Sequence, residues 1–341
     1  MAVAVEAICS LAVSLTLTLL AAGALLWPRA LPPPPPPLWC FYDTDNPFDV
    51  ARSGQLCDMI VVCCLVDERA FDAMTELVQR LGHARLDPRV LVMPWRAGED
   101  VFWRQLCHAH VTSEFIDAFL AATRGLQLAG VVRAYTSDCP AEAAFLEERL
   151  LRLAQRHSTR RPVKAAVWDA AAEMQKDVNR CNSASHVLIW WEEPLDGSTK
   201  RCHFNVSRSV TAASAARRFY QHAAIVHVVP ASWSLVHEND PHYRSADVLV
   251  GNPSTDQRTA ASNPSCGAYP IRGSRSVYIR PMPRVLRQLV ARLVSVDPRT
   301  GGALLVTHLA DDEAAADSVG RPQATILRQM YRILRERIVS Y

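Results

Sequence analysis

Aromatic side chains are the residues of this sequence best suited to hold a ligand. Six of them fall at or just after the carboxyl ends of predicted strands: Trp95, Tyr135, Trp168, Trp190, Trp191 and Trp233. Rings in such positions can stack on the apolar faces of sugars, which predicts a platform for a glycan. The competing interpretation is that these rings cap a hydrophobic core, because Trp is highly buried on average. The sequence leaves both interpretations open.

Two histidines, His108 and His110, form a pair that could ligate a metal ion. No third ligand follows at a suitable spacing, and the cysteines contain no C-x-x-C pair. The sequence therefore predicts neither a metal nor another cofactor. The arginine pairs 160–161 and 217–218 are predicted to be solvated charges at helix ends rather than anion sites.

The charge balance of the chain limits the partners it can have. Its 341 residues include 37 Lys or Arg and 34 Asp or Glu, so the formal net charge is +3. This balance excludes a nucleic-acid-binding protein that relies on a positive field over the whole molecule. Hydrophobic residues make up 49% and charged residues 21%, which is typical of a folded protein.

The N-terminus is a separate unit, because residues 1–37 contain only Glu6 and Arg29 as charged side chains. Residues 7–27 are uncharged, and at about 1.5 Å per residue such a helix crosses the hydrocarbon core of a bilayer. Six prolines follow within 31–37 as a stiff stem. Residues 1–30 are thus predicted to be a signal anchor or a cleaved signal peptide, and an uncleaved segment would make the membrane a partner.

Cysteine usage predicts an exported protein. Nine cysteines follow the apolar segment, a density that suits an oxidising compartment, and Asn205 begins a valid N-glycosylation sequon. We expect the remaining chain to lie on the extracellular side, either secreted or held by a single membrane span.

Short β-branched runs alternate with helical patterns from residue 38 to the end of the chain, which we take as one domain, 38–341. The predicted strands are 38–42, 59–66, 89–93, 130–135, 163–168, 185–191, 223–229 and 302–307. The predicted helices are 69–82, 113–126, 141–157, 169–181, 209–221, 284–296 and 321–338. Eight strands, most followed by a helix, predict an α/β fold, a (β/α)8 TIM barrel. Residues 237–280 are too long for an ordinary connection and predict a small insertion between the seventh strand and its helix.

Several segments resemble glycoside hydrolase family 18, the chitinases and chitinase-like proteins, over essentially all of residues 38–341. WCFYD at 39–43 with QLCDMIVVCCLV at 55–66 resembles the family's first two strands, which implies a disulfide between Cys40 and Cys57. GGALLVTHLADDE at 301–313 resembles the eighth strand and its GG-x-x-x-W-x-x-x-x-DD pattern, with Val306 at the position of the tryptophan that floors the sugar pocket.

The catalytic run of that family, D-G-x-D-x-D-x-E, has lost its carboxylates here. It reads AGVVRAYT at 129–136, so Val132 and Ala134 stand at the two aspartates and Thr136 stands at the glutamate that would protonate the glycosidic oxygen. A threonine hydroxyl cannot act as that general acid at neutral pH. The resemblance therefore implies a barrel without catalytic activity.

Two functions remain open. The first is a non-catalytic chitinase-like protein that binds a chitin-type oligosaccharide, another glycan or a protein partner at the barrel mouth. The second is a residual or repurposed glycosidase that uses a displaced carboxylate, for which Asp138 and Glu192 are the candidates.

Overall fold

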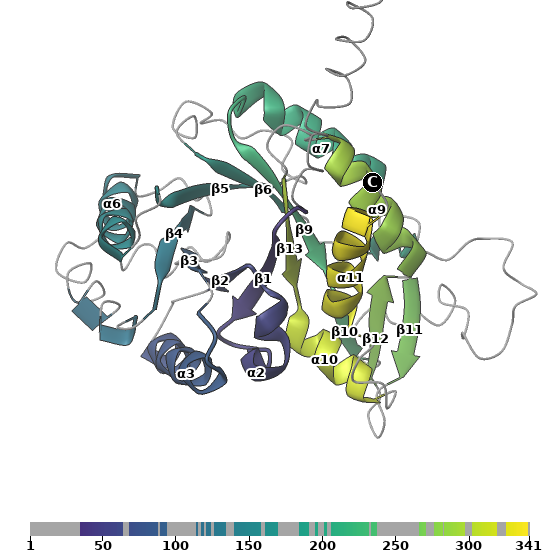
Figure 1. Ribbon diagram of the computed structural model, residues 1–341, viewed down its shortest axis with the longest axis horizontal. Coiled ribbons are helices and arrows are strands. Elements are labelled where there is room, and N and C mark those ends of the chain that lie inside the picture. The colour runs from purple at the N-terminus through teal and green to yellow at the C-terminus, as the bar shows by residue number, and fades with distance from the viewer. Residues whose placement is uncertain are drawn as a thin grey trace, which may run out of the picture.

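Eight apolar runs lie side by side as parallel strands and close into a barrel (Figure 1). Their order around the barrel is β1, β13, β9, β6, β5, β4, β3 and β2. The strands are β1 (Leu38–Asp43), β2 (Met59–Cys63), β3 (Arg89–Met93), β4 (Leu128–Arg133), β5 (Val163–Asp169), β6 (His186–Trp190), β9 (Ala224–Pro230) and β13 (Ala303–Thr307). All eight predicted strands, and with them the TIM barrel, are confirmed. Valine and leucine are the commonest residues in these runs because both faces of the strands are buried.

The computed structural model describes most of residues 38–341. The described residues are 35–63, 68–87, 89–93, 114, 117–118, 121–123, 126–133, 140–157, 161–169, 184–190, 195–196, 201–202, 206–231, 233–236, 266–270, 276–281, 283–296, 302–318 and 325–339. The predicted N-terminal segment 1–30 and most of the predicted stem 31–37 lie outside them. No helix among the described residues is long and apolar enough to span a membrane.

Helices cover the outside of the barrel. They are α2 (Val50–Ser53), the 3-10 turn η1 (Gly54–Leu56), α3 (Glu68–Ala84), α6 (Pro140–His157), α7 (Val206–Phe219), α9 (Pro283–Val296), α10 (Leu309–Ser318) and α11 (Ile326–Val339). Five predicted helices are thereby confirmed as α3, α6, α7, α9 and α11. Residues 114, 117–118 and 121–122 of the predicted helix 113–126 are helical, whereas the predicted helix 169–181 lies outside the described residues except for Asp169, which ends β5.

Helix α10 was missed by the sequence prediction. Its sequence, LADDEAAADS, has no amphipathic stripe that would mark a helix. Acidic side chains in its first turn, Asp311 and Asp312, suit a helix N-terminus because they oppose its positive dipole end. Local charge rather than hydrophobic periodicity therefore favours this helix.

A small antiparallel sheet follows the seventh barrel strand, and two of its three strands come from the predicted insertion 237–280, whereas the first begins four residues before it. Its strands, in the order β10, β12, β11, are β10 (Trp233–Val236), β12 (Ser276–Pro281) and β11 (Cys266–Pro270). The sheet contacts α10 at one end of the barrel wall (Figure 1). A two-stranded hairpin, β7 (Leu195–Asp196) with β8 (Arg201–Cys202), follows β6.

Two ring contacts cross the barrel and fix which strand residues face its axis. The ring centroids of Trp39 in β1 and His186 in β6 lie 5.3 Å apart, and those of Phe41 and Trp190 on the same two strands lie 5.4 Å apart. Strands β1 and β6 are not neighbours in the barrel, so all four side chains point inward.

Cys40 lies between two inward residues of β1 and therefore points outward. It forms a disulfide with Cys57, which lies two residues before β2, with 5.7 Å between the Cα atoms. The predicted disulfide is confirmed. Because neighbouring strands in register place their side chains on the same face, this alternation can be followed around the whole barrel.

Candidate functional site

Sites in TIM barrels form at the carboxyl ends of the strands, so the inward residues at those ends define the candidate site. Following the register from Phe41 and Trp190, the inward residues with described side chains there are Asp43, Cys63, Met93, Val132, Trp190, Pro230 and Thr307. Five of these seven are buried, whereas Asp43 and Trp190 are half-buried. The described floor of the barrel mouth is therefore closed and mostly apolar, with one carboxylate and one indole ring that solvent reaches.

Trp190 is held by the barrel interior rather than by a loop. It ends β6, and its ring meets Phe41 edge-on, with 66° between the ring planes. An edge-to-face contact of this kind leaves one face of the indole available to a neighbour. Trp190 therefore agrees with both interpretations of the aromatic residues, because its ring caps the hydrophobic core and also borders the barrel mouth.

The fourth strand places its only charged residue away from the mouth. Val132 points inward and is fully buried, whereas Arg133 points outward to α6. There the Arg133 Nε donates to Glu147 Oε2 at 2.6 Å, and Lys164 Nζ lies 3.0 Å from Glu147 Oε1. The Glu147 side chain is only 4% exposed. The Arg133–Glu147 contact thus joins β4 to α6 on the outside of the barrel. The inner face of β4 at position 132 is apolar.

Three of the six predicted ligand-binding aromatic residues are described by the structure, and Trp190 is the one of these three that is found at the mouth. Trp168 precedes the last residue of β5, but its ring lies outside the barrel, 6.1 Å from the ring of Tyr220 beside α7. Its assignment to the glycan platform is therefore corrected. Trp233 belongs to β10 of the inserted sheet rather than to a barrel strand. Trp95, Tyr135 and Trp191 lie outside the described residues.

Val306 of β13 points away from the barrel axis. Val306 pairs in register with Cys40 and so shares its outward face, which means that the residue of β13 beside the mouth is Thr307. This corrects the sequence alignment that put Val306 at the floor of a sugar pocket. The other predicted site positions lie outside the described residues: Ala134, Thr136, Asp138, Glu192, His108, His110 and Asn205.

The glycine that survives from the family's catalytic run has a steric role. Gly130 adopts φ +155°, and a Cβ atom there would stand 1.9 Å from the carbonyl oxygen of Val163 on β5. Gly302 at the start of β13 adopts φ +50°, a conformation that favours glycine. Both glycines are required by the packing of the strands, whatever the chemistry of the site.

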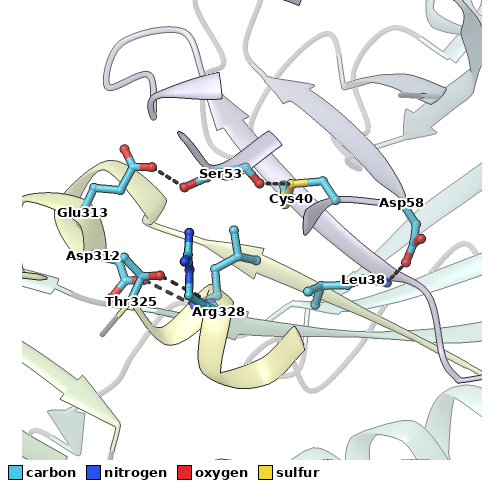
Figure 2. The surroundings of a disulfide bond; sticks show 10 residues. Leu38, Cys40, Ser53, Asp58, Asp312, Glu313, Thr325 and Arg328 are labelled. Carbon is cyan, nitrogen blue, oxygen red and sulfur yellow. Dashed lines mark hydrogen bonds between the residues drawn. A yellow bond between two sulfur atoms is a disulfide. The ribbon is translucent and has the colours of Figure 1, made fainter. Parts of the chain in front are cut away.

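Asp312, the second of the paired aspartates after β13, also acts within the scaffold (Figure 2). Asp312 is fully buried, and its Oδ2 accepts from the backbone N–H groups of Ile326 at 2.7 Å and Leu327 at 3.4 Å, at the start of α11. This carboxylate therefore caps α11 and opposes its positive dipole end.

Glu313 ties α10 to the segment after β1. Its carboxylate accepts from the Asp49 backbone N–H at 2.8 Å and from the hydroxyl of Ser53. Burial raises the pKa of Glu313, and burial likewise raises the pKa of the neighbouring Asp311. Asp311 accepts only a long bond, 3.4 Å, from the Asn46 side chain. These contacts serve packing between α10 and the first βα unit.

Two inward residues at the mouth, Asp43 and Cys63, were not proposed from the sequence. The available signal was the outward Cys40, which fixes Phe41 and Asp43 as inward by alternation along β1. Asp43 Oδ1 accepts from the Asp45 backbone N–H at 3.1 Å, and Asp43 pairs in register with Cys63. Cys63 is itself disulfide-bonded. The described residues contain no group of three or more His, Cys, Asp or Glu side chains that could hold a metal ion.

No family model and no curated protein matches the sequence. Solved structures do match it. The GH18 chitinase ChiB from Flavobacterium johnsoniae matches with a TM-score of 0.56 and 9% identity, over 89% of this chain and 95% of that one. YKL-39, solved in the presence of chitooligosaccharides, matches with a TM-score of 0.55 and 11% identity, over 89% of this chain and 100% of that one.

A third match is the chitinase-like agglutinin from Robinia pseudoacacia, with a TM-score of 0.51 and 10% identity, over 87% of this chain and 99% of that one. The chain has the fold of the glycoside hydrolase family 18 barrels. This group includes both chitinases and chitinase-like proteins. At about one residue in ten identical, the likeness to the family 18 barrels is one of fold, and the chemistry of this chain must be argued from its own residues.

Proposed function

We propose that this protein is a non-catalytic chitinase-like barrel that binds a chitin-type oligosaccharide at its mouth. The observation that carries the proposal is the apolar inner face of β4, where Val132 is fully buried and Arg133 turns outward to Glu147. In a family 18 enzyme this strand end would supply the acidic groups.

The features shared with the family divide cleanly by role. Those that remain, Gly130, Gly302, Asp312 and the Cys40–Cys57 disulfide, all have structural partners in the barrel. Those that are absent are the carboxylates of the catalytic run at positions 132, 134 and 136. Loss of chemistry with retention of scaffold supports a barrel that still folds and no longer cleaves.

The missing groups matter because the family mechanism depends on them together. A general acid contributes about 10²–10⁴ in rate, and in the substrate-assisted mechanism a second carboxylate orients the acetamido group that attacks. Val132 supplies neither charge nor hydrogen bonds. We therefore expect no efficient hydrolysis of chitin oligosaccharides.

Trp190 supports the choice of a sugar ligand. Its indole is half-buried at the end of β6 and contacts Phe41, so it offers a fixed apolar surface at the same mouth as Asp43, a hydrogen-bond acceptor. A flat ring with nearby polar atoms suits the alternating apolar and hydroxyl faces of a sugar. Two proteins of the same fold also support a sugar ligand. YKL-39 was solved in the presence of chitooligosaccharides, and the Robinia pseudoacacia protein is named a chitinase-like agglutinin.

Calorimetric titration of the purified ectodomain with chitotetraose, together with chromatography of the reaction products, tests the proposal. We expect saturable binding without cleavage. Trp190→Ala should weaken binding at least about fivefold, because stacking on an aromatic ring contributes about 1–3 kcal/mol. Trp168→Ala is the matched control, since its ring lies outside the barrel. Absence of binding, or equal losses in both variants, would contradict a glycan site at Trp190.

A residual glycosidase is the second candidate, favoured by Asp43, whose half-buried carboxylate lies at the mouth. Asp138 and Glu192 are the other displaced carboxylates to be tested. Cleavage of chitotetraose that disappears in Asp43→Asn, Asp138→Asn or Glu192→Gln would establish this function in place of the first. The paired replacement Ala134→Asp with Thr136→Glu should not restore activity if the floor of the site has also changed.

Export belongs to the same proposal. The Cys40–Cys57 disulfide fits an extracellular location, with Asn205 glycosylated directly before α7. Expression in a secretory cell line should give a product whose mass falls on peptide N-glycosidase treatment, and Asn205→Gln should abolish that shift. N-terminal sequencing of the product distinguishes a cleaved signal peptide from an anchor spanning residues 7–27.

A further inference from the structure

Arginines are concentrated on three helices of the barrel wall. There are three in α7, three in α9 and four in α11, whereas the three helices together contain a single acidic residue, Glu336. The overall net charge of +3 therefore conceals a strongly uneven distribution. From the sequence alone, residues 217–218 read as an isolated pair of solvated charges.

The fold brings these three helices together, although they are far apart in the sequence. Helix α9 contacts both α7 and α11, and the three lie on the opposite side of the barrel from α3 and α6 (Figure 1). We call their outer surface the arginine face. Its described arginines are Arg217, Arg218, Arg284, Arg287, Arg328, Arg332 and Arg335.

The positions of these residues along each helix put them toward solvent. In α9, Arg284 and Arg287 are exposed, while Leu286, Leu289 and Val290 are buried against the barrel. In α11, Arg332 and Arg335 are exposed, and the Arg335 guanidinium lies 5.1 Å from the centre of the Tyr331 ring. This contact orients a charged group on the surface without neutralising it.

For the three exposed arginines that are most useful as a test, the described side chains offer no compensating carboxylate. No ion pair joins Arg287, Arg332 or Arg335 to an acidic group there. The neighbouring acids of α10 are engaged elsewhere, since Asp312 caps α11 and Asp317 pairs with Arg52 at 2.9 Å.

The other side of the barrel follows the usual rule of mixed charge. On α3, Arg80 pairs with Glu76, and on α6, Arg152 pairs with Glu148, both four residues apart. Proteins ordinarily intersperse charges of both signs over their surface, because a large field of one sign attracts counter-ions and polyanions. The arginine face departs from this rule over three adjacent helices.

We infer that the arginine face binds a sulfated polysaccharide. The guanidinium is planar and donates in a fork that matches the oxygens of a sulfate or phosphate group. The Cys40–Cys57 disulfide favours an extracellular setting, where sulfated glycans are the abundant linear polyanions rather than nucleic acids. The surface lies on the barrel wall, so this inference is independent of ligand binding at the mouth.

Binding to immobilised heparin, a sulfated polysaccharide, tests the inference with a matched pair of triple variants of the full exported domain. The first is Arg287→Glu, Arg332→Glu, Arg335→Glu on the arginine face, and the second is Arg152→Glu, Arg156→Glu, Arg161→Glu on the opposite side. All six arginines are exposed. Each triple lowers the formal charge by six, from +3 to −3, so bulk charge is identical in the two variants.

We expect the first triple to weaken binding at least tenfold and the second to change it by less than about threefold. Binding of the natural sequence should fall steeply between about 0.05 M and about 0.5 M salt, because exposed charge pairs are screened. Circular dichroism and thermal melting confirm that both variants are folded, and their affinity for chitotetraose should equal that of the natural sequence.

Three results would overturn the inference: no binding of the natural sequence to heparin, equal loss in both triples, or equal binding to desulfated heparin. Single-stranded RNA and vesicles containing phosphatidylserine complete the comparison. Tighter binding to either of these at the same salt concentration would assign the arginine face to nucleic acid or to membrane, and would also overturn it.

Discussion

Replacing Asp312 by alanine removes a buried cap and tests whether the aspartate pair after β13 serves the scaffold. The carboxylate is fully buried and accepts from Ile326 N at 2.7 Å and from Leu327 N at 3.4 Å. Loss of a cap costs about 0.5–2 kcal/mol, and leaving a buried amide without an acceptor costs about 1–3 kcal/mol. Thr325 Oγ1 still accepts from the Arg328 N–H at 3.4 Å, which preserves part of the cap. We therefore expect a loss of about 2–4 kcal/mol in the free energy of unfolding.

Urea unfolding followed by far-ultraviolet circular dichroism measures this loss. Asp311→Ala is the control, because Asp311 accepts only a 3.4 Å bond from Asn46 and lies 3.9 Å from His308. Its removal should cost less than about 0.5 kcal/mol, as expected of weak surface contacts. Folded Asp312→Ala should bind chitotetraose as the natural sequence does. A loss below about 0.5 kcal/mol for Asp312→Ala, or a larger loss for Asp311→Ala, would refute the structural role of Asp312.

Three further predictions concern buried groups of the barrel. Burial, with a smaller contribution from Arg89, lowers the pKa of His186 from 6.5 to about 4. Between pH 6.5 and about pH 4, therefore, only the unfolded chain takes up a proton at this histidine. The free energy of unfolding should fall by roughly 3 kcal/mol as the pH drops through this range. His186→Gln should remove that part of the pH dependence in urea titrations. Gly130→Ala should lower the free energy of unfolding by more than about 3 kcal/mol or prevent folding, because its Cβ atom would lie 1.9 Å from the carbonyl oxygen of Val163. A stable alanine variant with an unchanged unfolding midpoint would contradict this prediction. Glu147→Gln should lower the free energy of unfolding by about 1–3 kcal/mol. This is less than the roughly 3–5 kcal/mol expected of a fully buried pair, because the side chains of its partners Arg133 and Lys164 are 21% and 29% exposed. A loss no greater than that of an exposed pair would show that the two cations are well solvated without Glu147.

The barrel could be predicted from the sequence because each strand is a short run of apolar residues whose signal is local. The face that each side chain occupies could not be predicted in the same way, since it depends on the register between strands. Trp168 and Trp190 both stand near the end of a strand, yet one packs outside the barrel and the other inside. A shift of one residue reverses the face, and the Cys40–Cys57 disulfide is a covalent marker of which face the residues of β1 occupy.

The remaining features arise from contacts between distant parts of the chain. Helix α10 lacks a hydrophobic stripe, and its buried acids find their partners in α2, α11 and the segment after β1. The arginine face depends on α7, α9 and α11 lying side by side, although α7 and α9 are separated by the whole inserted sheet. Periodicity along the chain does not carry this kind of information.

The steric demand at Gly130 also bears on how such a protein can evolve. A side chain at this position would meet the backbone of β5 whether or not the barrel cleaves sugar, so selection for folding alone retains the glycine. Position 132 has no comparable backbone conformation to preserve, so drift can replace a carboxylate there once hydrolysis ceases to be selected. A descendant of an enzyme can therefore keep the glycine long after the acids have gone, and ancestry is better traced through the residues that shape the strand than through those that performed the reaction.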